Sequence, residues 1–137
     1  MIDPVIRRLV ELTPKARKLI DGKNFANLAT LMPDGSPQVT PVWIDRDGDI
    51  ILVNTAEGRQ KPKNLARDPR VALDIFDQSD PYTWTQIRGR MVEMTKEGAE
   101  DHIDKMAKKY IGKEKYPWRQ PGQDRILIKI QAEHISN

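Results

Sequence analysis

The densest group of chemically capable side chains lies in residues 54–70, a basic segment that follows the apolar run at 50–53. Between Glu57 and Arg70, the basic residues outnumber the two acidic ones and are Arg59, Lys61, Lys63, Arg67 and Arg70. A helix start exposes backbone N–H groups without intrahelical partners and carries a partial positive charge. Pro62 suits a first turn, where its missing N–H has no partner to lose. The segment therefore predicts either a phosphate-type anion site or a solvated basic turn.

Side chains that commonly act as nucleophiles, general bases or metal ligands are sparse in this chain. There is no cysteine, which excludes disulfides, thiolate nucleophiles and Cys-ligated metals. The two histidines, His102 and His134, do not stand in a metal-ligand spacing, and we expect both at the surface or in structural contacts. The sequence has no nucleophile elbow, Walker loop or dinucleotide-binding glycine motif. An enzyme with this sequence would therefore depend on a bound cofactor for its chemistry.

The composition indicates one globular domain, residues 1–137, in a cytoplasmic protein. Hydrophobic residues make up 38% and charged residues 31%, and no apolar run is long enough to cross a bilayer. The N-terminus alternates apolar and charged residues, unlike a signal peptide. A formal charge of +3 suits a small anion or a nucleic acid. Because aromatic residues are only 6% and do not alternate with basic ones, we favour the small anion.

Helical signals occur at the N-terminus and near residue 100. Asp3-Pro4 and Thr13-Pro14 each pair a capping residue with a helix-compatible proline, which predicts two short helices before Gly22. Their apolar faces would carry Val5, Leu9 and Leu12 in the first, and Ala16, Leu19 and Ile20 in the second. Residues 95–110 predict a longer helix capped by Thr95, with acidic residues early and lysines late.

Short strands separated by turn signals occupy most of the remaining chain. Residues 25–31, 38–44 and 49–55 predict three antiparallel strands in a meander, with turns at 33–36 and 45–48. Pro37 and Pro41 indicate an edge, a bulge or a ligand contact in the second strand. Further strands are predicted at 70–76, 82–94 and 125–131, the second of these with a bulge or bend at Gly89. The helix between strands could form a parallel βαβ unit, but six or more strands with short helices favour a barrel.

The order of these segments resembles the pyridoxamine-5'-phosphate-oxidase-like split β-barrel proteins, especially the branch that uses coenzyme F-420. The resemblance spans about residues 20–136 and rests on the segments FANLATL at 25–31, DGSPQVTPVW at 34–43, RQKPKNL at 59–65 and DPRVA at 68–72. The segments at 116–118 and 133–136 fit it too. It implies a mainly β, α+β fold, a split β-barrel of about six antiparallel strands, and a homodimer with two cofactor sites at the subunit interface.

The resemblance also implies a set of cofactor-binding residues. Arg59 and Lys61 match the basic pair that binds the cofactor phosphate, Asn64 matches the polar residue of the adjoining helix, and Lys63 adds a positive charge. The second-strand residues that match the segment along the tricyclic ring are Gln38, Thr40, Pro41 and Val42. Those at the end of the third strand, where a side chain could reach the phosphate, are Asn54 and Thr55. The aromatic residues that would approach from the partner subunit, or pack in the barrel, are Tyr82 and Trp84.

Two tricyclic cofactors fit this resemblance, coenzyme F-420 and FMN. Lys63, together with lysines at 108, 109, 113 and 115, would suit the polyanionic tail of F-420 better than the single phosphate of FMN. The chain lacks an extended C-terminal region like that of the vitamin B6 oxidases. The leading expectation is therefore an oxidoreductase that transfers a hydride from F-420 to a small organic acceptor. The alternatives are an FMN-dependent oxidase or reductase on the same fold and a non-catalytic F-420-binding protein.

Overall fold

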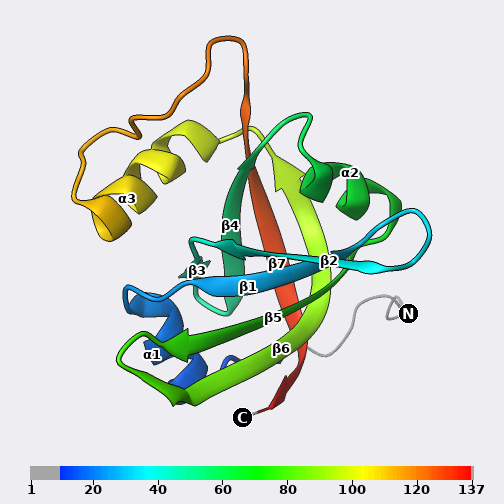
Figure 1. Cartoon of the computed structure of the whole chain (residues 1–137), viewed down its shortest axis with the longest axis vertical. Coiled ribbons are helices and arrows are strands. Elements are labelled where there is room, and N and C mark those ends of the chain that lie inside the picture. The colour runs from blue at the N-terminus through cyan, green and yellow to red at the C-terminus, as the bar shows by residue number, and fades with distance from the viewer. Residues whose placement is uncertain (1–9, 137) are drawn as a thin grey trace, which may run out of the picture.

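A computed structural model describes residues 10–136 of the chain (Figure 1). The helices of this part are α1 (Pro14–Asp21), α2 (Gln60–Arg67) and α3 (Ala99–Ile111). The strands are β1 (Ala26–Leu31), β2 (Pro37–Val42), β3 (Asp45–Asp47), β4 (Ile50–Ala56), β5 (Arg70–Asp77), β6 (Asp80–Thr95) and β7 (Arg125–Ser136). No helix among the described residues is both long and apolar enough to span a bilayer.

The seven strands form one antiparallel sheet in the order β2-β1-β5-β6-β7-β4-β3. β2 and β3 lie at opposite edges of the sheet, yet only Trp43 and Ile44 separate them in sequence. A two-residue link can join the two edges only if the sheet curls until they approach each other. The result is a barrel with an open seam between β2 and β3, which confirms the expected α+β split β-barrel.

The predicted meander is wrong. β1 pairs with β2, as expected, but β2 does not pair with β4, which instead lies between β3 and β7. Residues 45–47, predicted as part of a turn, form the short strand β3, and a two-residue turn, Gly48 and Asp49, reverses the chain, with a φ of 61° at Gly48. Local turn signals predict where the chain reverses direction, but they do not predict which strands become neighbours in the sheet. The placement of β2 confirms the expectation from Pro37 and Pro41, because an edge strand needs fewer ladder donors.

The predicted second helix is confirmed as α1, whose N-cap Thr13 accepts a hydrogen bond from the Ala16 backbone N–H. Most of the first predicted helix, including Val5 and Leu9, lies outside the described residues. Leu12 is not helical; it precedes α1 and is buried in the core. The helix predicted at 95–110 begins later than expected.

Thr95 is not the cap of α3, because it still belongs to β6, and the N-cap is Gly98 in the left-handed region. Thr95 instead accepts a hydrogen bond from the Glu97 backbone N–H in the turn that leads to the helix. The buried stripe of α3 contains the expected Ala99, Ile103, Met106, Ala107 and Tyr110, and also His102.

The predicted bend at Gly89 is confirmed as a register shift between β6 and β7. A Cβ at this position would overlap the backbone carbonyl oxygen of Gln131, so the close approach of the strands requires glycine. The main core fills the barrel with aliphatic side chains from α1, α2 and the five strands β1 and β4–β7, including Leu28, Ile75 and Ile128. α3 packs outside the barrel against β4 and β7, near the seam (Figure 1).

Candidate functional site

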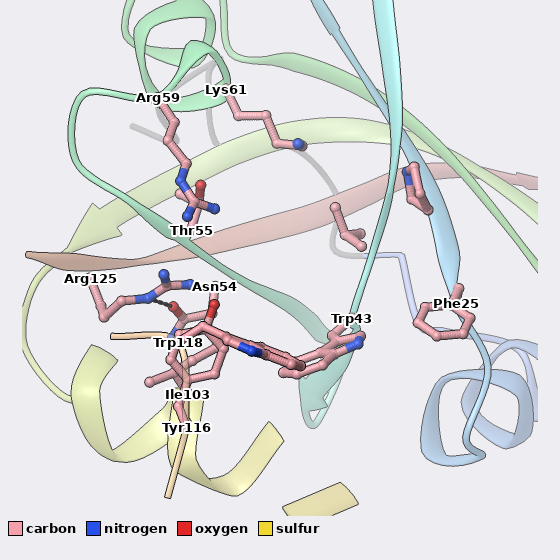
Figure 2. Close-up of a pocket in the computed structure, with 12 residues that line it drawn as sticks. Phe25, Trp43, Asn54, Thr55, Arg59, Lys61, Ile103, Tyr116, Trp118 and Arg125 are labelled. Atoms are coloured by element: carbon pink, nitrogen blue, oxygen red, sulfur yellow. Dashed lines mark hydrogen bonds between the residues drawn. The ribbon is translucent and has the colours of Figure 1, made fainter. Parts of the chain in front are cut away.

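A cavity of about 270 Å³ opens at the seam of the barrel. Its walls come from the end of β2, Trp43, β4, the start of α2, α3, the loop at 112–124 and the first residue of β7. The close-up in Figure 2 shows basic side chains hanging from the start of α2 on one side and aromatic side chains on the other. The cavity therefore has a cationic end and an aromatic end.

Arg59 and Lys61 form the cationic end nearest α2 (Figure 2). Gly58, with a φ of 88°, turns the chain from β4 into this helix and places both residues at its start. Burial lowers the pKa of Lys61, and the positive charge of Arg59 lowers it further. Within residues 10–136, neither side chain forms an ion pair with a carboxylate. Two neighbouring cations without a counter-charge are a favourable environment for an anion.

Arg125 adds a third positive charge from the first residue of β7. It is 5% exposed, and its guanidinium carbon lies 5.0 Å from the Tyr116 ring centroid. Burial lowers its pKa, and Arg59 contributes to the lowering. Its Nε donates to Asn54 Oδ1 at 2.9 Å, which fixes the plane of the guanidinium. Arg125 is thus a buried, oriented cation on the cavity wall.

Trp43 is the centre of the aromatic end. Its ring stacks on Tyr110 with centroids 5.2 Å apart and planes 3° apart, and it meets Tyr116 and Trp118 at 6.2 and 6.4 Å. Phe25 packs on the same Tyr110 at 5.5 Å. Because Tyr110 holds Trp43 from behind, the cavity face of this cluster is a rigid apolar wall suited to a flat ring system.

Asp104 of α3 holds the loop that carries Tyr116 and Trp118. Its Oδ1 accepts from the Tyr116 backbone N–H at 2.8 Å and from Arg119 Nη1 at 2.9 Å, and Lys115 Nζ lies 3.5 Å from Oδ2. The hydrogen bond from Arg119 is the largest influence on the pKa of Asp104, which is lowered to about 2 despite the opposing effect of burial. The loop is therefore attached to α3 by a charged carboxylate.

Half of the residues predicted from the sequence line this cavity, namely Pro41, Val42, Asn54, Thr55, Arg59 and Lys61. Gln38 and Thr40 do not line it, but they share with Val42 the half-buried face of β2. The buried Thr40 hydroxyl has no hydrogen-bond partner among the described residues. An unpartnered hydroxyl beside the cavity is compatible with a bound group there.

The other four predicted residues lie away from the cavity lining. Lys63 is exposed on α2, whereas Asn64 is fully buried and donates to Thr30 Oγ1 at 3.0 Å, a contact that joins α2 to β1. Tyr82 and Trp84 are exposed in the first part of β6 and do not line this chain's own cavity.

Sequence reasoning missed the other half of the lining, which comprises Phe25, Trp43, Ile103, Tyr116, Trp118 and Arg125. Trp43 and the segment at 116–118 had supported the family resemblance, but without an assigned role. In the sequence, Arg125 directly precedes the apolar run at 126–130, and this position shows only that a charged residue begins a strand, not that it lines a cavity. The pairing of Ala56 with Arg125 in the β4–β7 register brings Arg125 to the cavity, and no local sequence pattern contains that pairing.

The lysines considered for an anionic tail are only partly available. Lys109 donates to the backbone carbonyls of Ile20 and Ile44 at 2.6 and 2.9 Å, so its ammonium group is engaged in contacts within the protein and does not face a ligand. Lys108 lies 3.5 Å from a Glu114 carboxylate oxygen, and Lys115 is paired with Asp104. The electrostatic preference for a polyanion therefore depends on the cavity cations, on Lys63 and on the exposed Lys113.

Comparison with known proteins gives one family and several related structures. The family model described as pyridoxamine 5'-phosphate oxidase matches residues 12–137. A solved F-420 reductase is 26% identical to this chain, with a TM-score of 0.77 and alignment over 88% of this chain and 94% of that one. A conserved hypothetical protein from Mycobacterium tuberculosis is 23% identical, with a TM-score of 0.66 over 93% and 84% of the two chains.

The second of these structures supports the fold alone, because its identity to this chain is low. The family model, in contrast, covers nearly the whole chain and includes every strand and helix that builds the cavity. The seam, the cationic start of α2 and the aromatic wall thus lie within the matched region. The chain belongs to the pyridoxamine 5'-phosphate oxidase family.

Proposed function

We propose that the protein is an oxidoreductase whose cavity binds coenzyme F-420 and positions it against a small organic acceptor. The observation that carries this proposal is the combination of Arg59 and Lys61 at one end of the cavity, Arg125 beside Tyr116, and the Trp43–Trp118 wall at the other end. A ligand that matches both ends has a flat aromatic ring system and an attached phosphate. The cofactors that meet this description on the family's fold are F-420 and FMN.

The charges favour F-420 over FMN. Three cations at a single phosphomonoester would leave positive charge uncompensated, whereas a phosphodiester followed by an oligoglutamate tail carries more negative groups. Lys63, exposed on α2 next to the pair of Arg59 and Lys61, would meet the tail outside the cavity. The 26% identity to an F-420 reductase over most of both chains supports the same choice.

The chain's own residues would bind, orient and shield rather than transfer protons. The cavity-lining residues of the described chain include no carboxylate and no histidine. Arg59, Lys61 and Arg125 would hold the phosphate, and the aromatic wall would fix the ring plane and exclude water. When bound, F-420 supplies the carbon that carries the hydride. Substrate choice would then depend on the loop at 112–124, which covers the aromatic end.

Equilibrium titration of the purified protein with F-420 and with FMN tests this proposal. We expect micromolar or tighter binding of F-420, weakened by about 1.5–3 kcal/mol in Lys61→Ala, because a charge-assisted contact is lost. The control Lys18→Ala removes an exposed lysine of α1 and should bind as the wild type does. Tight FMN binding without F-420 binding would overturn the choice of cofactor, and unchanged affinity in Lys61→Ala would remove Lys61 from the site.

A turnover assay distinguishes the proposed oxidoreductase from a protein that binds F-420 without catalysing a reaction. We expect oxidation of reduced F-420 by at least one acceptor in a broad panel of small organic electrophiles. Tight F-420 binding without transfer to any member of such a panel would favour the carrier function. A yellow protein on purification, with flavin released on denaturation, would favour the FMN-dependent oxidase or reductase instead.

We also propose that two copies of the chain form a homodimer. Tyr82 is 89% exposed and Trp84 39% exposed, and neither contributes to this chain's cavity. A second hollow of about 390 Å³ lies on the outer face of the sheet between β1, β5, β6 and β7. In the dimer the two aromatic residues would approach the partner's cofactor. Sedimentation equilibrium is expected to show a dimer, and a monomer at micromolar concentration would contradict the proposal.

A further inference from the structure

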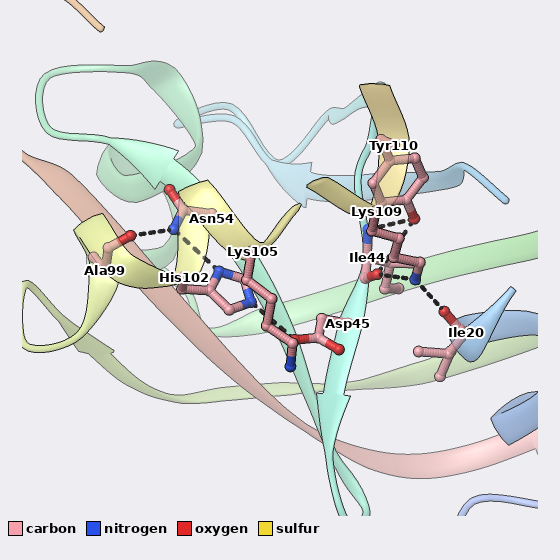
Figure 3. A network of polar contacts seen from close by, with 9 residues as sticks. All are labelled: Ile20, Ile44, Asp45, Asn54, Ala99, His102, Lys105, Lys109 and Tyr110. Carbon is pink, nitrogen blue, oxygen red and sulfur yellow. Dashed lines mark hydrogen bonds and ion pairs between the residues drawn. The ribbon is translucent and has the colours of Figure 1, made fainter. Parts of the chain in front are cut away.

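A series of hydrogen bonds links a buried carboxylate of β3 to Asn54 (Figure 3) and continues from Asn54 to Arg125 on the cavity wall (Figure 2). Asp45 Oδ2 lies 3.1 Å from His102 Nε2, and His102 Nδ1 lies 3.1 Å from Asn54 Nδ2. Asn54 Nδ2 also donates to the Ala99 carbonyl at 2.8 Å, and Asn54 Oδ1 accepts from Arg125 Nε at 2.9 Å. Four elements, β3, α3, β4 and β7, thus meet in one polar network.

The donor and acceptor of every hydrogen bond in this network follow from two groups, one of which can only accept and the other only donate. The Ala99 carbonyl can only accept and Arg125 Nε–H can only donate, so the Asn54 amide must point its NH2 toward Ala99 and its oxygen toward Arg125. The second amide hydrogen then points at His102 Nδ1, which must accept. The proton of a neutral imidazole is therefore on Nε2, where it donates to Asp45.

Asp45 is suited to select this tautomer. Burial alone would raise its pKa, but hydrogen bonds from His102, the Arg46 backbone and Lys105 outweigh burial and hold the pKa below its usual range. The carboxylate is therefore charged and accepts only. His102 and Asp45 are 8% and 9% exposed, so water offers the ring few alternative partners. The charged groups that face His102 are Asp45 from β3, Lys105 from α3 and, through Asn54, Arg125 from β7.

We propose that His102, in its Nε2–H tautomer, is a positioning residue that orients Asn54 and, through it, the Arg125 guanidinium at the anion-binding end of the cavity. His102 does not line the cavity and touches no ligand there. Its role is to accept the second amide hydrogen of Asn54, so that the amide oxygen stays on Arg125. The consequence for cofactor affinity rests on the proposed function, whereas the consequence for Arg125 does not.

Two substitutions separate the contribution of the Nδ1 contact with Asn54 from that of the Nε2 contact with Asp45. His102→Asn keeps an acceptor on Cγ, where Nδ1 is attached, and loses the donor to Asp45. His102→Gln keeps a donor one atom further out, near Nε2, and loses the acceptor for Asn54. Both remove the ring, so any loss of packing is common to the two. A difference between them reports the contact with Asn54.

Nitrogen NMR of the wild type tests the tautomer directly. The chain has only two histidines, and the exposed His134 serves as the reference signal. Near neutral pH, His102 is expected to show a protonated Nε2 and an unprotonated Nδ1. An Nδ1–H tautomer or a doubly protonated ring would overturn the proposal, and this measurement does not require that either variant folds.

The Arg125 Nε–H signal and F-420 titration test the positioning. His102→Asn is expected to keep hydrogen-exchange protection of Arg125 Nε–H and F-420 affinity near the wild-type values. His102→Gln is expected to lose about tenfold in each, the size of one charge-assisted hydrogen bond. Equal losses in both variants, or no loss in either, would overturn the proposal. If the wild type does not bind F-420 but the Arg125 signals differ as expected, the cofactor assignment fails and the positioning role stands.

Discussion

Asp104→Asn tests whether a charged anchor on α3 holds the loop over the aromatic end of the cavity. In the wild type, one carboxylate binds the Tyr116 backbone N–H, the Arg119 guanidinium and the Lys115 ammonium group. The amide can still accept one hydrogen bond, but it carries no charge for the two cations. We therefore expect a folded protein with a loosened loop at 112–124.

The expected loss in unfolding free energy follows from the pKa of Asp104, which is lowered from 3.8 to about 2. At about 1.4 kcal/mol for each pKa unit, this shift corresponds to about 2 kcal/mol. Arg119 and Lys115 are 36% and 81% exposed, so solvent screening reduces the expected loss to about 1–2 kcal/mol. A lowered folded-state pKa means that the stabilisation is complete above the unfolded-state pKa and is lost as the pH falls toward about 2.

Urea unfolding of the wild type and Asp104→Asn, repeated from neutral pH down to about pH 3, measures this difference. We expect the gap in unfolding free energy to shrink as the pH falls, because Asp104 of the unfolded chain, with its ordinary pKa, becomes protonated before Asp104 of the folded protein does. Asp101→Asn is the matched control, since Asp101 is exposed on the same helix and its side chain forms no hydrogen bond or ion pair among the described residues. A gap that is constant with pH, or equal in the two variants, would refute the anchoring role of Asp104.

Three further substitutions test other parts of the structure. Tyr110→Phe removes a hydroxyl bonded to two buried backbone groups and should cost about 2–3 kcal/mol in urea unfolding, whereas Tyr82→Phe, at an exposed position, should cost almost nothing. Gly89→Ala should destabilise the fold by at least about 2 kcal/mol, because its Cβ would overlap the backbone of β7, and a wild-type unfolding curve would contradict that contact. Trp118→Ala should leave stability unchanged, because the side chain is 57% exposed, but weaken F-420 binding about three- to tenfold; unchanged binding would remove Trp118 from the ring site.

The sequence predicted the parts of the fold that local patterns determine. Residues 60–67 show a helix start in their own composition, and Gly89 marks a strand that cannot run straight. Strand neighbours follow from packing across the whole barrel, which is why the separation of β2 from β4 was not predicted. The same limit applies to the site, where the local basic pair Arg59 and Lys61 was found but Arg125 was not.

Helix α3 determines the shape of the cavity through residues on adjacent turns. Ala99 and His102 hold Asn54 and thereby the anion end, Ile103 forms part of the wall, and Tyr110 supports Trp43 at the aromatic end. Because one helix makes all these contacts, a change in its packing would move Arg125 and the aromatic wall together, whereas Arg59 and Lys61 are carried by α2. The loop at 112–124 is joined to α3 through Asp104 and Glu100, by one hydrogen bond from the Tyr116 backbone N–H and by ion pairs with Lys115 and Arg119. We therefore expect differences in acceptor among related proteins to arise in the parts of this loop outside Tyr116 and Trp118, because those two side chains belong to the cavity wall.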